Sequence, residues 1–248
     1  MTKYYVYSFR YDCDNAIMLR NRLKGQRIKL VDSSYQEKPG DVVINWGNSK
    51  CPYVNKVVNH PIGVGFAVNK SITFDLLRNA GIKTPEITRS PKVVARWLTD
   101  GHRVLGRTIL TGNNGAGIVW CKKDKPIPEA KLYVKYIPNT TEFRVNVYRG
   151  KEISVRAKER DGAVEANPIR SGNNGYFFKD AVMAPALRES LLSVADAATR
   201  CLGLDFSGVD VLVDQAGNIT VLEVNTAPEL RGDAMTRLST YIQADYGV

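Results

Sequence analysis

Apolar residues along the first half of the chain predict short strands that alternate with helices. Strands are predicted at residues 4–9, 28–31 and 42–44, and helices at residues 14–23, 69–81 and 91–101. Gly25 follows the first helix as a typical end signal. Ser90 and Pro91 provide a cap and a first-turn proline for the third helix. Pro85 makes the segment at 82–87 a connector or an edge strand.

The second half of the chain is richer in predicted strands. These lie at residues 132–137, 142–148, 151–158, 207–213 and 219–225. Between the third and fourth of them, Leu187 to Leu202 carries apolar residues at helical spacing and stops before Gly203. The last twenty residues predict a terminal helix. The pattern indicates an α/β protein with an N-terminal α/β lobe at 1–60, a second small lobe at 61–130 and a C-terminal lobe at 131–248.

Composition narrows the class of protein. The 248 residues are 44% apolar, and no apolar run reaches the length of a membrane-spanning helix, so we expect a folded protein without a membrane segment. The N-terminus lacks the apolar stretch of a signal peptide. Four widely spaced cysteines form no Cys-x-x-Cys pair, which favours a reducing, cytoplasmic location without a zinc site. With only two histidines, metal and acid–base chemistry must depend on carboxylates.

The net charge of +10 favours an anionic partner. A nucleotide, a nucleic acid or an acidic polymer would each suit that charge. Lysine and arginine are spread along the chain without a block of like charges, so nothing indicates a nucleic-acid-binding tail. A basic protein with no anionic partner is the alternative interpretation.

A predicted hairpin near the C-terminus places two carboxylates opposite each other. With residue 214 paired to residue 219, Asp210 faces Glu223, Asn225 follows on the same face, and Val211 faces Leu222 on the apolar face. Opposed carboxylates repel, and a hard cation such as Mg²⁺ would relieve the repulsion. The pattern predicts a metal site, and a solvated polar face is the alternative.

A glycine-rich turn between two apolar runs is the second candidate for chemistry. Residues 104–110 and 118–120 flank the segment from Thr111 to Gly117, in which backbone N–H groups could approach phosphate oxygens. The Gly-Lys-Ser/Thr ending of a Walker A motif is absent. An ordinary hairpin turn is the competing interpretation.

Two segments together resemble a known superfamily. Gly208-Val209-Asp210-Val211-Leu212 and Leu222-Glu223-Val224-Asn225-Thr226-Ala227-Pro228 are similar to the paired metal-binding strands of ATP-grasp enzymes, above all the ligases that add glutamate to ribosomal proteins and the D-alanine–D-alanine ligases. The resemblance covers roughly residues 65–235. It implies an ATP-grasp fold, in which a small N-terminal α/β lobe precedes two lobes that clamp ATP.

The resemblance also implies roles for individual residues. Asp210, Glu223 and Asn225 would bind Mg²⁺, expected as two ions with Mn²⁺ as an alternative. The residues implied for ATP are Lys70, Arg107, Gly112, Asn113, Asn114, Gly115, Gly117, Lys135, Tyr136, Ile137 and Glu142. The residues implied for catalysis are Arg144, Lys158 and Arg170. Arg107 and Lys135 depart from the superfamily, which usually has a lysine near the first position and a Glu or Gln at the second.

The implied activity is that of an ATP-dependent carboxylate–amine ligase. It would form an amide through an acyl phosphate and release ADP and phosphate. The basic charge favours an acidic small molecule, peptide or polymer as substrate, with an amine acceptor, and leaves a nucleic-acid substrate open. A kinase on the same scaffold and a non-catalytic nucleotide-binding module are the alternatives. Arg156, Lys158 and Arg160 alternate along one strand, where they would either line the cleft or face solvent.

Overall fold

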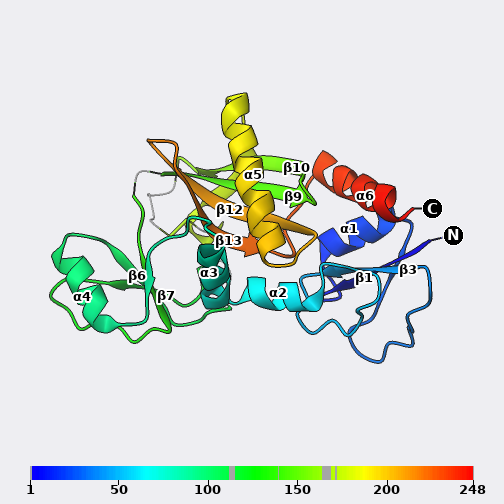
Figure 1. Ribbon diagram of the computed structural model, residues 1–248, viewed down its shortest axis with the longest axis horizontal. Coiled ribbons are helices and arrows are strands. Elements are labelled where there is room, and N and C mark those ends of the chain that lie inside the picture. Colours follow the sequence, from blue (N-terminus) through cyan, green and yellow to red (C-terminus); the bar gives the residue numbers. More distant parts are fainter. Residues whose placement is uncertain (1, 112–114, 139, 164–168, 171, 248) are drawn as a thin grey trace.

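Three β-sheets organise the computed structural model (Figure 1), which describes residues 2–111, 115–138, 140–163, 169–170 and 172–247. The first sheet belongs to the N-terminal lobe and has the order β2-β1-β3-β4, with every pairing parallel. Its strands are β1 (Lys3–Ser8), β2 (Gln26–Arg27), β3 (Asp41–Trp46) and β4 (Val57–Val58).

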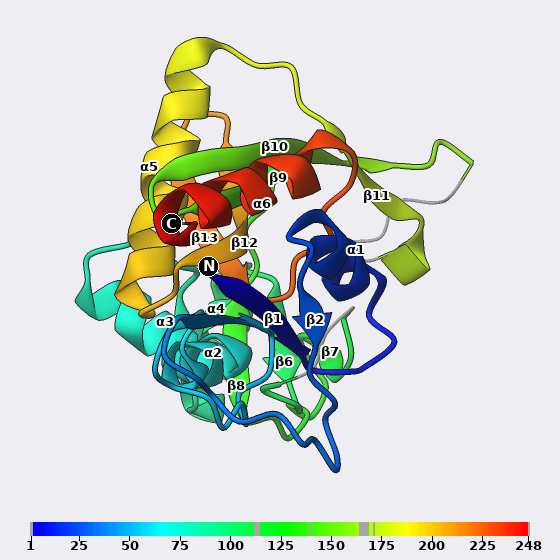
Figure 2. The same ribbon diagram turned by 90° about the vertical axis from the view of Figure 1, so that its right-hand side faces the viewer.

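Helices from opposite ends of the chain cover one face of this first sheet. α1 (Asp14–Arg22) and α6 (Asp233–Tyr246) pack together there, as Figure 2 shows. Leu19 of α1 and Leu238 of α6 are fully buried in the same apolar cluster as Val6 and Ile44 of the sheet. The predicted terminal helix therefore completes the N-terminal lobe.

The second sheet has the order β5-β8-β6-β7 and is antiparallel. Its strands are β5 (Ile87–Thr88), β6 (Val104–Arg107), β7 (Ile118–Cys121) and β8 (Leu132–Lys135). Helix α4 (Pro91–Thr99) packs on it through Val94 and Trp97. The predicted lobe boundary near residue 130 stays a prediction, and β8 extends this sheet beyond that residue.

The third sheet is antiparallel, with the order β11-β10-β9-β12-β13. Its strands are β9 (Thr140–Tyr148), β10 (Lys151–Arg160), β11 (Tyr176–Asp180), β12 (Phe206–Asp214) and β13 (Ile219–Asn225), and a short 3₁₀ turn, η1 (Gly172–Asn174), precedes β11. The long helix α5 (Pro185–Cys201) covers one face, where Leu191 and Ala195 pack on Val145 and Val209. Because side chains alternate between faces, the polar residues of β9, β10, β12 and β13 point to the face that α5 leaves open.

Two helices connect the first and second sheets. They are α2 (Pro61–Val68) and α3 (Lys70–Asn79), and Figure 1 shows them crossing from one lobe to the other. The sequence pattern predicts α3 and does not predict α2, whose two glycines argue against a helix. A Cβ on Gly63 would lie 2.6 Å from the Leu202 carbonyl oxygen, so the close packing of α2 on the end of α5 requires glycine there.

Other expectations for strands were partly wrong. The strand predicted at 28–31 is instead the two-residue β2, after which Ile28 continues as a buried residue outside the strand. β11 was not predicted, because its sequence, Tyr-Phe-Phe-Lys-Asp, has no alternation of apolar and polar residues. Over the described ranges, no helix is long and apolar enough to span a membrane.

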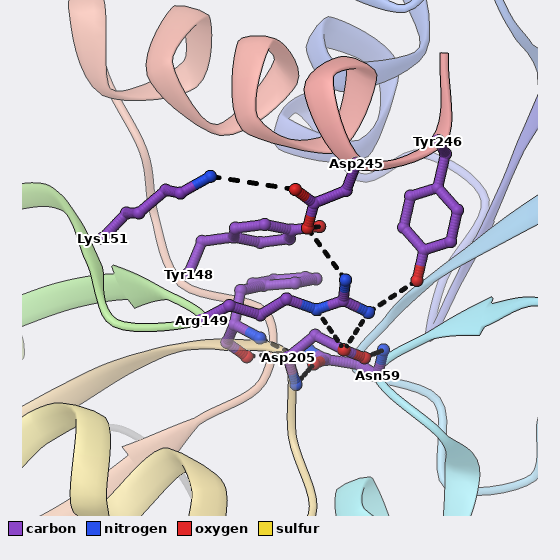
Figure 3. Close-up of polar contacts among 8 residues, drawn as sticks. Asn59, Tyr148, Arg149, Lys151, Asp205, Asp245 and Tyr246 are labelled. Atoms are coloured by element: carbon purple, nitrogen blue, oxygen red, sulfur yellow. Dashed lines mark hydrogen bonds and ion pairs between the residues drawn. The ribbon is translucent and has the colours of Figure 1, made fainter. Parts of the chain in front are cut away.

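A polar network joins the three parts of the chain that meet beside the first sheet (Figure 3). Arg149, in the turn between β9 and β10, donates to Asp205 Oδ1 (2.9 and 2.7 Å), to Asp245 Oδ2 (2.8 Å) and to the Tyr246 hydroxyl (2.6 Å). The backbone N–H of Asn59, at the end of the N-terminal lobe, donates to Asp205 Oδ2 (2.6 Å). These contacts tie the N-terminal lobe and α6 to the third sheet.

Candidate active site

A row of charged residues crosses the open face of the third sheet. The strand pairings place Asp180, Arg156, Arg144, Asp210 and Glu223 directly beside one another on β11, β10, β9, β12 and β13. The predicted juxtaposition of Asp210 and Glu223 is therefore present. The row also brings arginines from two neighbouring strands to the same face.

Lysine and arginine side chains neutralise both opposed carboxylates. Arg144 donates two hydrogen bonds to Asp210, from Nε to Oδ1 and from Nη2 to Oδ2, both at 2.7 Å. Lys70 Nζ lies 2.6 Å from Oε1 of Glu223. The Asp210 side chain is only 6% exposed, and its bidentate partner has the geometry of a strong charge-assisted pair. Burial lowers the pKa of Arg144, but the charge of Asp210 and its hydrogen bonds outweigh burial and raise it.

Asn225 completes this group. With its amide turned to satisfy both ends, Nδ2 donates to Glu223 Oε1 (3.1 Å) and Oδ1 accepts from Arg144 Nη2 (3.3 Å). The three predicted metal ligands thus lie within one hydrogen-bonded cluster. Asn225 therefore contacts Glu223 and also Arg144, the arginine that neutralises Asp210.

A β-bulge changes the predicted register beyond the carboxylates. Val211 pairs with Val221 instead of Leu222, so Leu222 is an extra residue between two paired positions. Val221 is consequently buried in the core under α5, whereas Leu222 lines the open face together with Glu223. The predicted pairing of Val211 with Leu222 was wrong, but the bulge begins after Asp210 and leaves the Asp210–Glu223 pair as predicted.

A cavity of about 490 Å³ lies over this face. It is lined by residues of the second sheet, of the third sheet and of the segment that follows β8. The predicted site residues that line it are Arg107, Gly115, Lys135, Tyr136, Ile137, Glu142, Arg144, Lys158, Arg170, Asp210 and Glu223. The cavity thus unites positions that are more than a hundred residues apart in the chain.

The end of the cavity towards the second sheet is largely apolar. Phe74, Leu105, Ile118 and Val134 line it from that side, and Leu222 lines it from the third sheet. Burial lowers the pKa of Arg107, and the negative charge of Glu223 opposes this shift only in part. Such a surface suits a flat, mostly apolar group with polar edges.

Glu142 and Lys158 form a second buried pair, two residues along β9 from Arg144. The lysine donates to Glu142 Oε1 and also to the Arg170 carbonyl oxygen (2.9 Å). Their side chains are 7% and 11% exposed. Burial raises the pKa of Glu142, and the positive charge of Lys158 opposes that shift.

The remaining predicted residues are placed differently. Lys70 is buried and bonded to Glu223, and it does not line the cavity. Gly117 adopts a positive φ of 72° in the turn before β7, and it does not line the cavity either. Gly112, Asn113 and Asn114 lie outside the described residues.

Several lining residues were not assigned from the sequence, among them Arg156 and the aromatic residues of β11. Arg156 lines the cavity beside Arg144, whereas Arg160, on the same strand, is exposed and does not. The aromatic residues of β11 line it as well, with the Phe178 ring 4.3 Å from the guanidinium carbon of Arg144 and 4.8 Å from the Lys158 ammonium. Finding them from sequence would have required β11 to be predicted.

The donor types of this cluster suit a magnesium ion. These donors are all oxygens from two carboxylates and an amide, the type that Mg²⁺ prefers. Within the described ranges, no group of three or more His, Cys, Asp or Glu side chains converges as a complete metal site. Oxygens from a bound phosphate or from water would have to complete the coordination.

Comparison with solved structures identifies the fold of the chain. The chain superimposes on the D-alanine–D-alanine ligase of Bacillus anthracis with a TM-score of 0.67 and 14% identity, over 99% of each chain. The chain has the ATP-grasp fold. The predicted α/β class and ATP-grasp fold are confirmed.

Other ATP-grasp structures are equally similar. The ATP-grasp ligase PsnB, solved with its minimal precursor, Mg and ADP, matches with a TM-score of 0.69 and 15% identity, over 98% of this chain and 97% of PsnB. A Chryseobacterium gregarium ATP-grasp ligase, solved with ADP and a leader and core peptide, matches with a TM-score of 0.67 and 12% identity, over 100% and 97%.

Sequence comparison agrees with the ATP-grasp fold. A probable alpha-L-glutamate ligase of Haemophilus influenzae is 26% identical over an alignment of 208 residues, and the match covers 76% of this chain and 68% of that protein. No protein-family model matches the chain. The predicted resemblance to ATP-grasp ligases is thus confirmed in sequence and in structure.

Proposed function

We propose that this protein is an ATP-dependent ligase that joins a carboxylate to an amine through an acyl phosphate. The observation that carries the proposal is the cluster of Asp210, Glu223, Asn225 and Arg144 at the cavity between the second and third sheets. The resemblance to a probable glutamate ligase and to ATP-grasp ligases solved with nucleotide supports it.

ATP would lie between the two sheets. The apolar end of the cavity suits the adenine, and Lys135, Tyr136 and Ile137 follow β8 where backbone groups can meet the base edge. Glu142 is in reach of the ribose in this proposal, and Arg107 and the glycine segment would meet the phosphates. Lys70 would act through Glu223, because its ammonium group already neutralises that carboxylate.

Magnesium would be held by Asp210, Glu223 and Asn225 together with phosphate oxygens. Bound there, it would neutralise charge on the transferred phosphoryl group. We propose that two magnesium ions bind, which is the number that the resemblance to ATP-grasp enzymes implies. Since Arg144 and Lys70 occupy both carboxylates, these cations would shift towards the phosphates and the substrate when metal binds.

The proposed reaction has two steps. A carboxylate oxygen attacks the γ-phosphorus, and the bond to the β-phosphate oxygen breaks, which releases ADP. An amine then attacks the acyl carbon, the bond from that carbon to the phosphate oxygen breaks, and the amine loses a proton. Arg144 and Arg170 would stabilise negative charge on the acyl group, while Lys158 is held in place by Glu142.

The oxygen balance of these steps provides the test. A carboxylic acid labelled with ¹⁸O in its carboxyl group must transfer one labelled oxygen to the phosphate that is released. We therefore expect ¹⁸O-phosphate, ADP and an amide in equal amounts, measured by mass spectrometry after a screen of carboxylic acids and amines.

Other outcomes would point to other chemistry. Phosphate left on the acceptor would indicate a kinase, and AMP with pyrophosphate would indicate an adenylating enzyme. ADP and amide without label in the phosphate would refute the acyl phosphate. The Arg170→Ala variant should lose more kcat than nucleotide affinity, because the arginine acts on the acyl group.

A further inference from the structure

Arg156 lines the cavity and is only weakly paired with a carboxylate. Its side chain is only 14% exposed, and its carboxylate partner Asp180 lies 3.6 Å away with a side chain that is 96% exposed. An ion pair with a fully hydrated carboxylate contributes little. By contrast, Arg144, Lys158 and Lys70 each hold a carboxylate that is itself mostly buried.

The guanidinium of Arg156 is fixed in position but keeps donors available. Nη2 donates to the Phe178 carbonyl oxygen, which anchors the group at the wall of the cavity. In the part of the chain that the structure describes, Nε and Nη1 donate no hydrogen bond. The Nη1 N–H groups are thus available to a carboxylate, while Nε faces only the exposed carboxylate of Asp180.

The charge of the cavity wall also calls for an anion. Seven lysine and arginine residues line it, against four glutamate and aspartate residues. ATP bound with two Mg²⁺ ions is electrically neutral, so the nucleotide complex would leave the positive excess in place. The reacting carboxylate of a monocarboxylic acid would offset only one of those charges.

Strand geometry places Arg156 at a defined distance from the proposed reaction. Arg156 pairs directly with Arg144, and Arg144 pairs with Asp210. Adjacent strands lie about 5 Å apart, so Arg156 stands one strand spacing from the arginine proposed to meet the acyl group. A chain of three or four carbon–carbon bonds spans roughly the same 5 Å.

We propose that Arg156 binds a second carboxylate of the acyl substrate, so that the enzyme selects an acid of glutamate or glutarate size with two carboxyl groups. This inference rests on the proposed ligase function. Arg156 acts here as a specificity residue, because it would contact the far end of the substrate and not the reacting atoms.

Glutarate and its monoamide provide the test, since they have nearly the same shape and differ in one carboxylate. Their affinities are measured by calorimetry on the whole protein with Mg²⁺ and a non-hydrolysable ATP analogue. We expect glutarate to bind at least tenfold more tightly. Arg156→Gln should reduce the ratio of the two affinities to about one, and Arg156→Lys should retain part of it.

Arg160→Gln is the matched control, because it removes an exposed arginine four residues along the same strand. It should keep the wild-type ratio, and all three variants should keep the affinity for the ATP analogue. The inference is refuted if wild type binds neither probe or binds both equally, or if Arg156→Gln still discriminates. Failure of wild type to bind the ATP analogue would instead refute the proposed function.

Discussion

At the residue scale, the site is a set of buried charges that neutralise one another. Asp210 and Glu223 stand side by side on neighbouring strands, where like charges repel. The sequence argument assigned their neutralisation to a metal ion. The structure adds Arg144 and Lys70, each within 2.7 Å of its carboxylate, so the pair is compensated before any metal binds.

Removing either carboxylate charge should therefore cost stability as well as activity. Asp210→Asn and Glu223→Gln keep the side-chain shape but leave Arg144 or Lys70 without its anion. Breaking a buried ion pair from one side costs on the order of 3 kcal/mol. We expect a lower free energy of unfolding in urea without nucleotide, and loss of turnover with ATP and Mg²⁺.

Glu189→Gln is the control for this pair, since it makes the same chemical change on the exposed side of α5. It should alter neither stability nor turnover. Near-normal turnover of both site variants at ordinary Mg²⁺ would contradict the assignment of Asp210 and Glu223 as metal ligands.

At the element scale, the β12–β13 hairpin and the segment after it form one packed unit. A Cβ on Gly208 would lie 2.6 Å from Asn146 Oδ1 and 2.7 Å from Cβ of Pro228. The glycine and the proline of the two motifs are thus packed closely together, and the Gly208 position has no room for a side chain. The bulge at Leu222 adds an apolar side chain to the same face without moving Glu223 away from Asp210.

Gly208→Ala should push β12 away from Pro228 and so displace Asp210. Overpacking of this kind costs about 1–3 kcal/mol, and we expect a corresponding loss of unfolding free energy together with a lower kcat. Gly65→Ala is the matched control, because a Cβ there meets nothing within 4 Å inside helix α2. It should raise stability by about 0.5–1 kcal/mol, since alanine favours a helix over glycine. An unaffected Gly208→Ala variant would contradict the tight packing of the two motifs.

At the scale of the whole molecule, polar contacts hold the N-terminal lobe and the C-terminal helix to the third sheet. Asp245 of α6 accepts from the Tyr148 hydroxyl (2.8 Å) and from Arg149 (2.8 Å), as Figure 3 shows. Burial alone would raise the pKa of Asp245, but these hydrogen bonds and the charge of Arg149 outweigh it and lower the pKa.

This shift predicts how stability depends on pH. A carboxylate whose folded pKa lies below its unfolded value, about 4, contributes stability above that pH and loses it as the pH falls through the folded pKa. Asp245→Asn should therefore lower the unfolding free energy at neutral pH and flatten its decline below about pH 4. Urea unfolding at several pH values measures both effects.

Asp12→Asn, which changes an aspartate whose side chain is 82% exposed, serves as the control. It should leave both the neutral-pH stability and the acid slope close to wild type. An Asp245→Asn profile parallel to that of wild type would show that Asp245 does not hold the lobes together through its charge.

Local signals determined much of this protein from the sequence alone. The helices at α1, α3, α4, α5 and α6, and the hairpins of β6–β7, β9–β10 and β12–β13, follow from apolar periodicity, caps and turns within short windows. The facing of Asp210 and Glu223 follows from a hairpin, whose register depends on a nearby turn. The ATP-grasp resemblance also rests on those two short motifs.

Tertiary structure alone decided the contacts between distant segments. Lys70 meets Glu223 from 153 residues away, and Arg144 meets Asp210 from 66 residues away, because the packing of α3 and the order of strands in the third sheet bring them together. Helix α2 depends on the close approach of Gly63 to α5, which outweighs its poor helix propensity. The bulge at Leu222 and the approach of Arg156 to the cavity likewise depend on neighbouring strands, and periodicity within one segment carries no information about its neighbours.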